Sequence, residues 1–221
     1  MDGGRVRRGA GRAALAAEVV RFVHRGLAAH PGRFVALAVG DSTLPLYAGL
    51  DPSDPGWAGR TITPVDELVP PPADPARTFG ARLAAALPEG LRARLAPLDP
   101  AVDGADLCAV VLGLGPDGHI AFNQPPTPVD APTRVVTVAP ANLARLGPVE
   151  PARSALTLGV APILAAGSVL VVAAGPGKEE AFRHLVDGPE DPAWPATWLR
   201  RHPRLTVVAG LDVSRSGQRL A

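Results

Sequence analysis

The 221-residue sequence predicts a single-domain α/β fold, in which a mostly parallel sheet is covered by helices on both faces. Short β-branched apolar runs alternate with helical stretches, as expected for a chain of β–α units. Most of these runs are apolar on both faces, which is typical of strands buried from two sides. Several runs end in glycine, at Gly40, Gly115 and Gly175, on the edge where open α/β sheets bind ligands. The expected architecture is Rossmann-like.

The first half of the chain contributes three of the expected strands. They are the apolar runs RFVALAVG (33–40), RTITPVDE (60–67) and LCAVVLGLG (107–115). Proline-rich VPPPADP (69–75) is a surface loop. The helical stretches expected in this half are 10–29, 43–50 and 77–95.

The second half continues the alternation. The expected strands here are TRVVTVAP (133–140), SVLVVAAG (168–175) and LTVVAG (205–210). NQPPTPVDAP (123–132) is a second proline-rich loop, and about eight residues at each chain end are expected to be disordered. The helical stretches expected in this half are 154–166, 177–187 and 195–201.

The charge balance argues against two classes of partner. The net charge is +1, from 22 basic and 21 acidic residues, which gives no electrostatic reason to expect nucleic acid or an anionic membrane. Lys178 is the only lysine in a chain whose other cations are arginines. A small-molecule ligand is therefore the expected partner.

The cysteine content and the N-terminus predict a cytoplasmic protein. The single cysteine, Cys108, excludes an intramolecular disulfide and reads as a buried small hydrophobe. The apolar stretch near the N-terminus is interrupted by Glu18 and Arg21, so it lacks the core of a signal peptide. No segment approaches the ~20 apolar residues that span a bilayer.

The stretch AVGDSTLPLY (38–47) places glycine and two hydroxyls between a strand and a helix. Backbone N–H groups beside Ser42 and Thr43 suit a phosphate group. The stretch is neither a Walker A loop nor a GxGxxG fingerprint. The alternative is a helix N-cap formed by Asp41 or Ser42.

Two further stretches carry acid–base or anion-binding groups. In PVDELVP (64–70), adjacent carboxylates on a strand point to opposite faces, so at most one faces the ligand edge as a general base. In AAGPGKEEAF (173–182), Lys178 in the first turn of a helix opposes the helix dipole unless it meets an anion. The alternatives are a solvated turn, and a solvated lysine paired with Glu179 or Glu180.

A fourth stretch, VVLGLGPDGH, ends in Asp117-Gly118-His119, which places a carboxylate two residues from an imidazole. A carboxylate that hydrogen-bonds to one imidazole nitrogen fixes the tautomer and supports proton transfer at the other nitrogen. The histidines lack the spacing of a metal site such as HxxxH, and the absence of a GxSxG elbow disfavours a Ser-His-Asp hydrolase.

Taken together, these stretches resemble the sugar-phosphate isomerase family that contains glucosamine-6-phosphate deaminases and 6-phosphogluconolactonases. The resemblance runs from about Phe34 to Asp212. Its most specific part is GPDGHIAFNQP (115–125), which is similar to the deaminase pattern DGHIAFN followed by Glu-Pro. SALTLGVAPIL (154–164) and WPATWLRRHP (194–203) are also similar to deaminase stretches.

The resemblance implies a reaction and a set of site residues. D-glucosamine 6-phosphate and water would give fructose 6-phosphate and ammonia, with neither a metal nor a redox cofactor. Asp66 would carry a proton between C2 and C1, and His119, oriented by Asp117, would assist opening of the pyranose ring. The implied catalytic residues are Asp66, Asp117, His119 and Gln124. The implied substrate-binding residues are Gly40, Asp41, Ser42, Thr43, Gly118, Arg145 and Lys178.

Three positions depart from the family pattern. Gln124 replaces a glutamate that would partner the histidine, and its amide supplies no charge to stabilise an imidazolium. On this interpretation, Gln124→Glu would raise turnover. Asp41 replaces a small neutral residue and would repel a phosphate unless it points away. Leu68 replaces the Tyr or Arg that often follows the Asp-Glu pair.

Three hypotheses follow. The first is an aminosugar-phosphate deaminase/isomerase, favoured by the AFN continuation and by the set of Asp66, His119 and Lys178. The second is a 6-phosphogluconolactonase in which His119 activates water. The third is a catalytically altered sugar-phosphate binder, favoured by Gln124 and Asp41. A homo-oligomer is compatible with all three.

Overall fold

The computed structural model describes residues 6–8 and 11–210, and its largest element is a six-stranded parallel sheet. Every neighbouring pair of strands in this sheet is parallel, as the sequence predicts. In spatial order its strands are β1 (Val6–Arg8), β9 (Leu205–Gly210), β8 (Val169–Ala174), β5 (Leu107–Gly113), β2 (Phe34–Leu37) and β3 (Thr61–Pro64).

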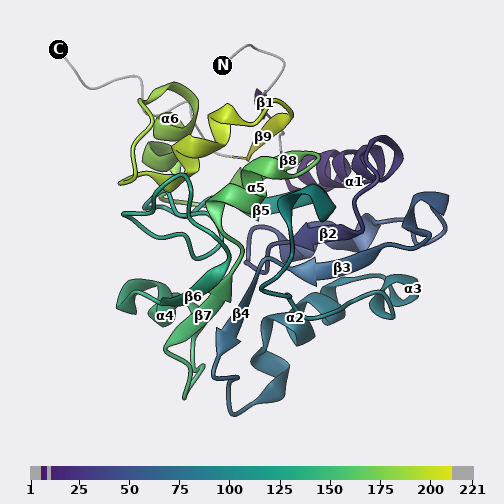
Figure 1. Ribbon diagram of the computed structural model, residues 1–221, viewed down its shortest axis with the longest axis horizontal. Coiled ribbons are helices and arrows are strands. Elements are labelled where there is room, and N and C mark those ends of the chain that lie inside the picture. Colours follow the sequence, from purple (N-terminus) through teal and green to yellow (C-terminus); the bar gives the residue numbers. More distant parts are fainter. Residues whose placement is uncertain (1–5, 9–10, 211–221) are drawn as a thin grey trace.

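Both faces of this sheet are covered, and successive residues of one strand enter different cores. Val169 and Val171 of β8 pack into the core beneath α5 (Val160–Ala165) and α6 (Glu179–Asp187). Leu170 and Val172 pack into the opposite core, beneath α1 (Arg12–Ala29). Figure 1 shows α1 on one side of the sheet and α5 and α6 on the other. This double burial confirms the interpretation of the apolar runs.

A second, three-stranded antiparallel sheet was not predicted. It lies below the large sheet in Figure 1 and has the order β4 (Asp66–Val69), β7 (Ser154–Thr157), β6 (Arg134–Thr137). Its inner face packs a third core that contains Leu68, Phe79 and Phe122.

The small sheet corrects three predicted elements. The single strand expected at 60–67 is two strands in different sheets, because the chain changes direction at Val65 after β3. The strand expected at 133–140 is β6, in the small sheet. The helix expected at 154–166 begins only at Val160, because residues 154–157 pair with both β4 and β6 as the central strand β7.

Other helical predictions were right in place and wrong in type or extent. Segments 43–50 and 195–201 form the 3₁₀ helices η1 (Leu44–Gly49) and η5 (Pro195–Arg201), each with proline in its first turn. The expected helix 77–95 is divided at Pro88, which cannot donate within a helix. Its two parts are α2 (Phe79–Ala86) and α3 (Glu89–Arg92), and the short 3₁₀ helix η3 (Pro75–Arg77) precedes them.

Some elements had no counterpart in the predictions. Val6–Arg8, expected to be disordered, pair with β9 as strand β1, and the rest of that expectation lies outside the described residues. The unpredicted helical segments are η2 (Pro55–Trp57), η4 (Gly104–Asp106) and α4 (Pro140–Leu146). None of the described helices is both long enough and apolar enough to cross a membrane.

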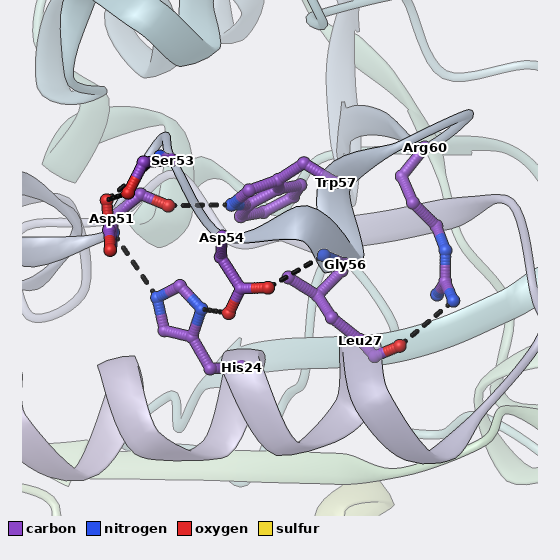
Figure 2. A network of polar contacts seen from close by, with 8 residues as sticks. All are labelled: His24, Leu27, Asp51, Ser53, Asp54, Gly56, Trp57 and Arg60. Carbon is purple, nitrogen blue, oxygen red and sulfur yellow. Dashed lines mark hydrogen bonds and ion pairs between the residues drawn. The ribbon is translucent and has the colours of Figure 1, made fainter.

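A polar network ties the segment 51–60 to α1 (Figure 2). The backbone N–H of Asp51 donates to Nε2 of His24 (3.3 Å), so the other ring nitrogen, Nδ1, carries the proton that faces the Asp54 carboxylate. The fully buried Trp57 donates to the Asp51 carbonyl (3.0 Å), and Arg60 donates to the carbonyl of Leu27 (3.0 Å). These contacts give His24 a structural role on the flank of the sheet.

Candidate active site

The C-terminal ends of β2, β5 and β8 open into a cavity of about 550 Å³. Neighbouring parallel strands present the segments that follow them at one edge, so three separate stretches of sequence meet there. The predicted site residues that line the cavity are Gly40, Asp41, Ser42, Thr43, Asp66, His119, Arg145 and Lys178. Asp117, Gly118 and Gln124 lie outside its lining.

The turn after β2 is held by its own side chains. Thr43 is fully buried, and its hydroxyl donates to the carbonyl of Ala38 (2.9 Å) and accepts from the N–H of Gly40 (3.2 Å). Ser42 faces the other way and accepts a hydrogen bond from Lys178 (3.3 Å), across from β8. Thr43 therefore shapes the turn, and Ser42 stands beside the cation.

Cations gather at this end of the cavity. Burial and the nearby positive charge of Arg145 lower the pKa of Lys178, while Asp41 opposes that effect. Arg82 of α2 also lines the cavity, and its guanidinium lies 3.5 Å from a carboxylate oxygen of Asp41. Such a cluster is suited to an anionic group of a ligand.

Asp66, the first residue of β4, is a buried carboxylate in the wall of the cavity. It is 7 % exposed and accepts a hydrogen bond from the N–H of Phe122 (3.1 Å). Burial raises the pKa of Asp66 to about 7, although its hydrogen bonds with Thr157 and Phe122 and the nearby His119 act in the opposite direction. A carboxyl group with such a pKa can both accept and release a proton near neutral pH.

The neighbouring Glu67 faces away and has a different function. Its carboxylate accepts from the backbone N–H groups of Phe79 and Gly80, both at 2.8 Å, at the start of α2. Only one of the adjacent carboxylates faces the cavity, as expected from the alternation of side chains along a strand. The other fixes the position of α2.

The approach of Phe122 to Asp66 depends on an uncommon backbone conformation. Ala121, which lines the cavity, has φ of 52°, in the left-handed region that residues with a Cβ rarely adopt. Asn123 secures the next position, because its side-chain amide donates to the carbonyls of Ile120 (3.1 Å) and Leu158 (2.8 Å). The AFN sequence thus shapes the turn that delivers an N–H to Asp66.

His119 lies in the turn that follows β5, with its ring against Gly115. A Cβ on Gly115 would fall 2.2 Å from Nδ1 of the imidazole, so only glycine fits there. Nδ1 is 2.5 Å from a carboxylate oxygen of Asp117. Burial alone raises the pKa of Asp117, but its hydrogen bond and charge interaction with His119 hold that pKa below its ordinary value.

The turn that carries this pair packs against η5. Gly118 has φ of 78°, and a Cβ there would lie 2.7 Å from the ring of Trp194. Its carbonyl accepts from the N–H of Ala196 (2.9 Å). Gly118 is therefore a structural residue of the turn, behind the cavity.

Gln124 does not partner the histidine in the part of the chain described; its side-chain amide binds the segment before and within α4. Its Oε1 accepts from the N–H of Ala139 (2.7 Å) and from Nδ2 of Asn142 (3.0 Å), and its Nε2 donates to the carbonyl of Thr137 (2.9 Å). Helix α4 carries Arg145 into the cavity. Gln124 thus acts on the site through the position of α4.

Sequence reasoning missed several residues of the site. Arg82 and Asn142 lie outside the motifs described above, and Thr157 lies within SALTLGVAPIL (154–164) but was not predicted as a site residue. All three reach the site through the packing of α2, α4 and β7. Among the described residues, no group of three or more His, Cys, Asp or Glu side chains is arranged to hold a metal ion.

Known proteins are similar to this chain in sequence and in fold. The sequence profile of the glucosamine-6-phosphate isomerases/6-phosphogluconolactonase family matches residues 81–208. A glucosamine-6-phosphate deaminase from Beutenbergia cavernae is 33% identical over 226 residues, covering 89% of this chain and 85% of the relative. The solved structure of a monomeric glucosamine-6-phosphate deaminase superposes with a TM-score of 0.72 at 21% identity, covering 93% of this chain and 96% of the other.

A solved 6-phosphogluconolactonase resembles this chain in structure about as closely as the solved deaminase does. The enzyme from Thermotoga maritima superposes with a TM-score of 0.69 at 17% identity, covering 93% of this chain and 99% of the other. At such identities the superpositions establish the fold, which the deaminase and the lactonase share with this chain.

Proposed function

Because this chain belongs to the family of glucosamine-6-phosphate isomerases and 6-phosphogluconolactonases, we propose that it converts glucosamine 6-phosphate and water to fructose 6-phosphate and ammonia. The Beutenbergia cavernae relative, whose alignment covers 89% of this chain, is named a glucosamine-6-phosphate deaminase. The observation that carries the proposal is Asp66, a buried carboxyl group with a pKa near neutrality in a cavity that also holds a histidine and several cations.

In the proposed mechanism, the cationic end of the cavity binds the phosphate and orients the sugar. Ser42, Arg145 and Lys178 line that end. An anchored phosphate uses binding energy remote from the reacting carbons to hold C1 and C2 beside the acid–base groups.

His119 would open the ring. Asp117 occupies its Nδ1, so the proton exchanged with the substrate passes through Nε2. Protonation of the ring oxygen and removal of the O1 proton give the open-chain aldehyde. The carboxylate of Asp117 stabilises the imidazolium formed along the way.

Asp66 would then move one proton between adjacent carbons. Its carboxylate removes the C2 proton, which is acidic because it lies α to the C1 carbonyl, and the resulting enolic species accepts that proton back at C1. The nitrogen becomes an imine at C2, and water hydrolyses this imine to the ketone and ammonia. The pKa of about 7 allows Asp66 to act first as base and then as acid.

An assay of ammonia release from glucosamine 6-phosphate tests the proposal, with hydrolysis of 6-phosphogluconolactone measured in parallel. Ammonia released by the wild type and lost in Asp66→Asn supports the deaminase. Lactone hydrolysis that depends on His119, without ammonia release, would instead support the second candidate function, a 6-phosphogluconolactonase. The lactonase is kept as that candidate because a solved lactonase matches this fold nearly as closely as the solved deaminase. Inactivity towards both substrates, with sugar phosphate still raising the melting temperature, would identify an altered binder.

A further inference from the structure

We propose that Arg82 is a cation of the phosphate subsite, and that Asp41 is the counter-ion it exchanges for the substrate's phosphate. The inference rests on the proposed function for the identity of the ligand. Arg82 comes from α2, outside every motif that the sequence offers. Its guanidinium and the Asp41 carboxylate lie 3.5 Å apart, and both residues line the main cavity together with Arg145 and Lys178.

The charges at this end of the cavity are complementary to a dianion. The cations that line the cavity are Arg12, Arg82, Arg145 and Lys178, and Asp41 offsets one of these charges from 3.5 Å away from Arg82. This excess of positive charge favours a phosphate monoester, which carries nearly two negative charges at neutral pH. Arginine also binds phosphate oxygens through two parallel N–H groups, which a single ammonium cannot do.

Arg82 and Asp41 differ in how far their side chains are exposed to solvent. The Asp41 side chain is 96 % exposed, whereas the Arg82 side chain is 27 % exposed. A carboxylate so exposed gives up little interaction energy when it leaves the guanidinium, because water already surrounds it and screens the pair. A phosphate entering the cavity can therefore replace Asp41 as the partner of Arg82.

The start of α2, which positions Arg82, is held by hydrogen bonds that do not involve the Arg82 guanidinium. Helix α2 begins with Glu67 accepting from Phe79 and Gly80, and with Thr78 accepting from the N–H of Ala81 (3.2 Å). The guanidinium of Arg82 lies 5.9 Å from the centre of the Phe79 ring. An unbranched apolar side chain can keep this packing, which makes Arg82→Met the informative substitution.

Binding of inorganic phosphate and of fructose 6-phosphate, measured by calorimetry, tests the assignment without any turnover. We expect Arg82→Met to weaken both by about tenfold, and Arg82→Lys to restore part of the loss. Arg77→Met is the matched control, because Arg77 is a nearby arginine outside the lining of the main cavity. Unchanged affinity in a folded Arg82→Met, or no phosphate binding by the wild type, would overturn the assignment.

The counter-ion role has its own test. Asp41→Asn removes the competing charge, so phosphate affinity should rise about threefold to tenfold, and the gain should shrink when Arg82 is also methionine. An equal gain in the presence and absence of Arg82 would show that Asp41 repels phosphate without exchanging partners.

Kinetics separate this inference from the proposed function. In a working deaminase, Arg82→Met should raise KM about tenfold with kcat changed less than threefold. A wild type that binds phosphate through Arg82 but releases no ammonia would contradict the function alone. A deaminase whose KM is indifferent to Arg82 would contradict the inference alone.

Discussion

Asp66 is a buried carboxyl group that faces the cavity and receives a hydrogen bond from the backbone N–H of a turn with a left-handed residue, a combination that the adjacent Glu67 does not show. If it is the base, kcat/KM should increase with pH as its carboxyl group ionises, with an acid limb near pH 7. Asp66→Asn should lose about 10²–10⁴-fold in kcat and the remaining activity should lack that limb. A wild-type profile that is flat between pH 5 and 8 would contradict the assignment.

The same group links pH to stability. Burial raises the pKa of Asp66 from 3.8 to about 7, so the folded protein holds this proton more tightly than the unfolded chain. Its effect on stability is most favourable below pH 3.8 and is lost as pH rises through about 7. Asp66→Asn should therefore gain stability relative to the wild type between pH 5 and pH 8, on the order of 2–4 kcal/mol. Denaturant unfolding at the two pH values measures the difference, and an equal difference at both would contradict the shift.

Gln124 gives a second prediction, and here the structure opposes the expectation drawn from sequence. A glutamate at this position would set a carboxylate oxygen against the carbonyl of Thr137, where the amide Nε2 now donates. We expect Gln124→Glu to displace α4 and Arg145, raising KM about fivefold to tenfold with a smaller effect on kcat. Steady-state kinetics beside Gln124→Met, which removes the amide without adding charge, would separate the two effects. A rise in kcat in Gln124→Glu alone would instead support a missing charge beside His119.

At the scale of the element, the turn after β5 needs glycine at positions where a Cβ would collide with a neighbouring side chain. Gly115→Ala would place a methyl group against the His119 ring, so the imidazole would have to leave its position beside Asp117. We expect at least a 10²-fold loss in kcat, with inorganic phosphate binding nearly unchanged because the cationic end is untouched. Calorimetry beside the activity assay checks this, and a parallel loss of phosphate binding would indicate a wider collapse.

The sequence patterns predicted the strands that are buried on both faces. They failed for segments whose structure depends on pairing with strands far away in the sequence. The β5 and β8 runs, apolar on both faces, were identified correctly because only a doubly covered strand needs that pattern. SALT (154–157) was read as helical, because its strand character comes from pairing with β4 and β6, segments far away in the sequence. The predicted residues that line the cavity were implied by the resemblance of their motifs to a known family, whereas Arg82 lies outside those motifs. It lines the cavity because Glu67 fixes the start of α2, a contact that the sequence does not reveal.

At the scale of the whole molecule, the histidine with a structural role, His24, is not the histidine proposed to act in catalysis, His119. His24 links α1 to the segment 51–60 through Asp51 and Asp54, on the flank of the sheet and outside the lining of the cavity (Figure 2). We expect His24→Ala to lower the free energy of unfolding by about 1–3 kcal/mol with kcat changed less than twofold. Denaturant unfolding and kinetics on one preparation would test this, and a large loss of kcat at full stability would contradict it.

The proposed phosphate-binding groups and the proposed acid–base group come from different parts of the fold. The groups proposed to hold the phosphate follow strands of the large sheet or belong to helices. Asp66 is the first residue of β4 in the small sheet, and a single residue, Val65, separates it from the end of β3. A bound sugar phosphate would therefore act as a non-covalent cross-link between two hydrogen-bonded units. Amide hydrogen exchange should slow in β4, β6 and β7 when the complete sugar phosphate binds, whereas inorganic phosphate, which reaches only one unit, should leave those amides almost unprotected.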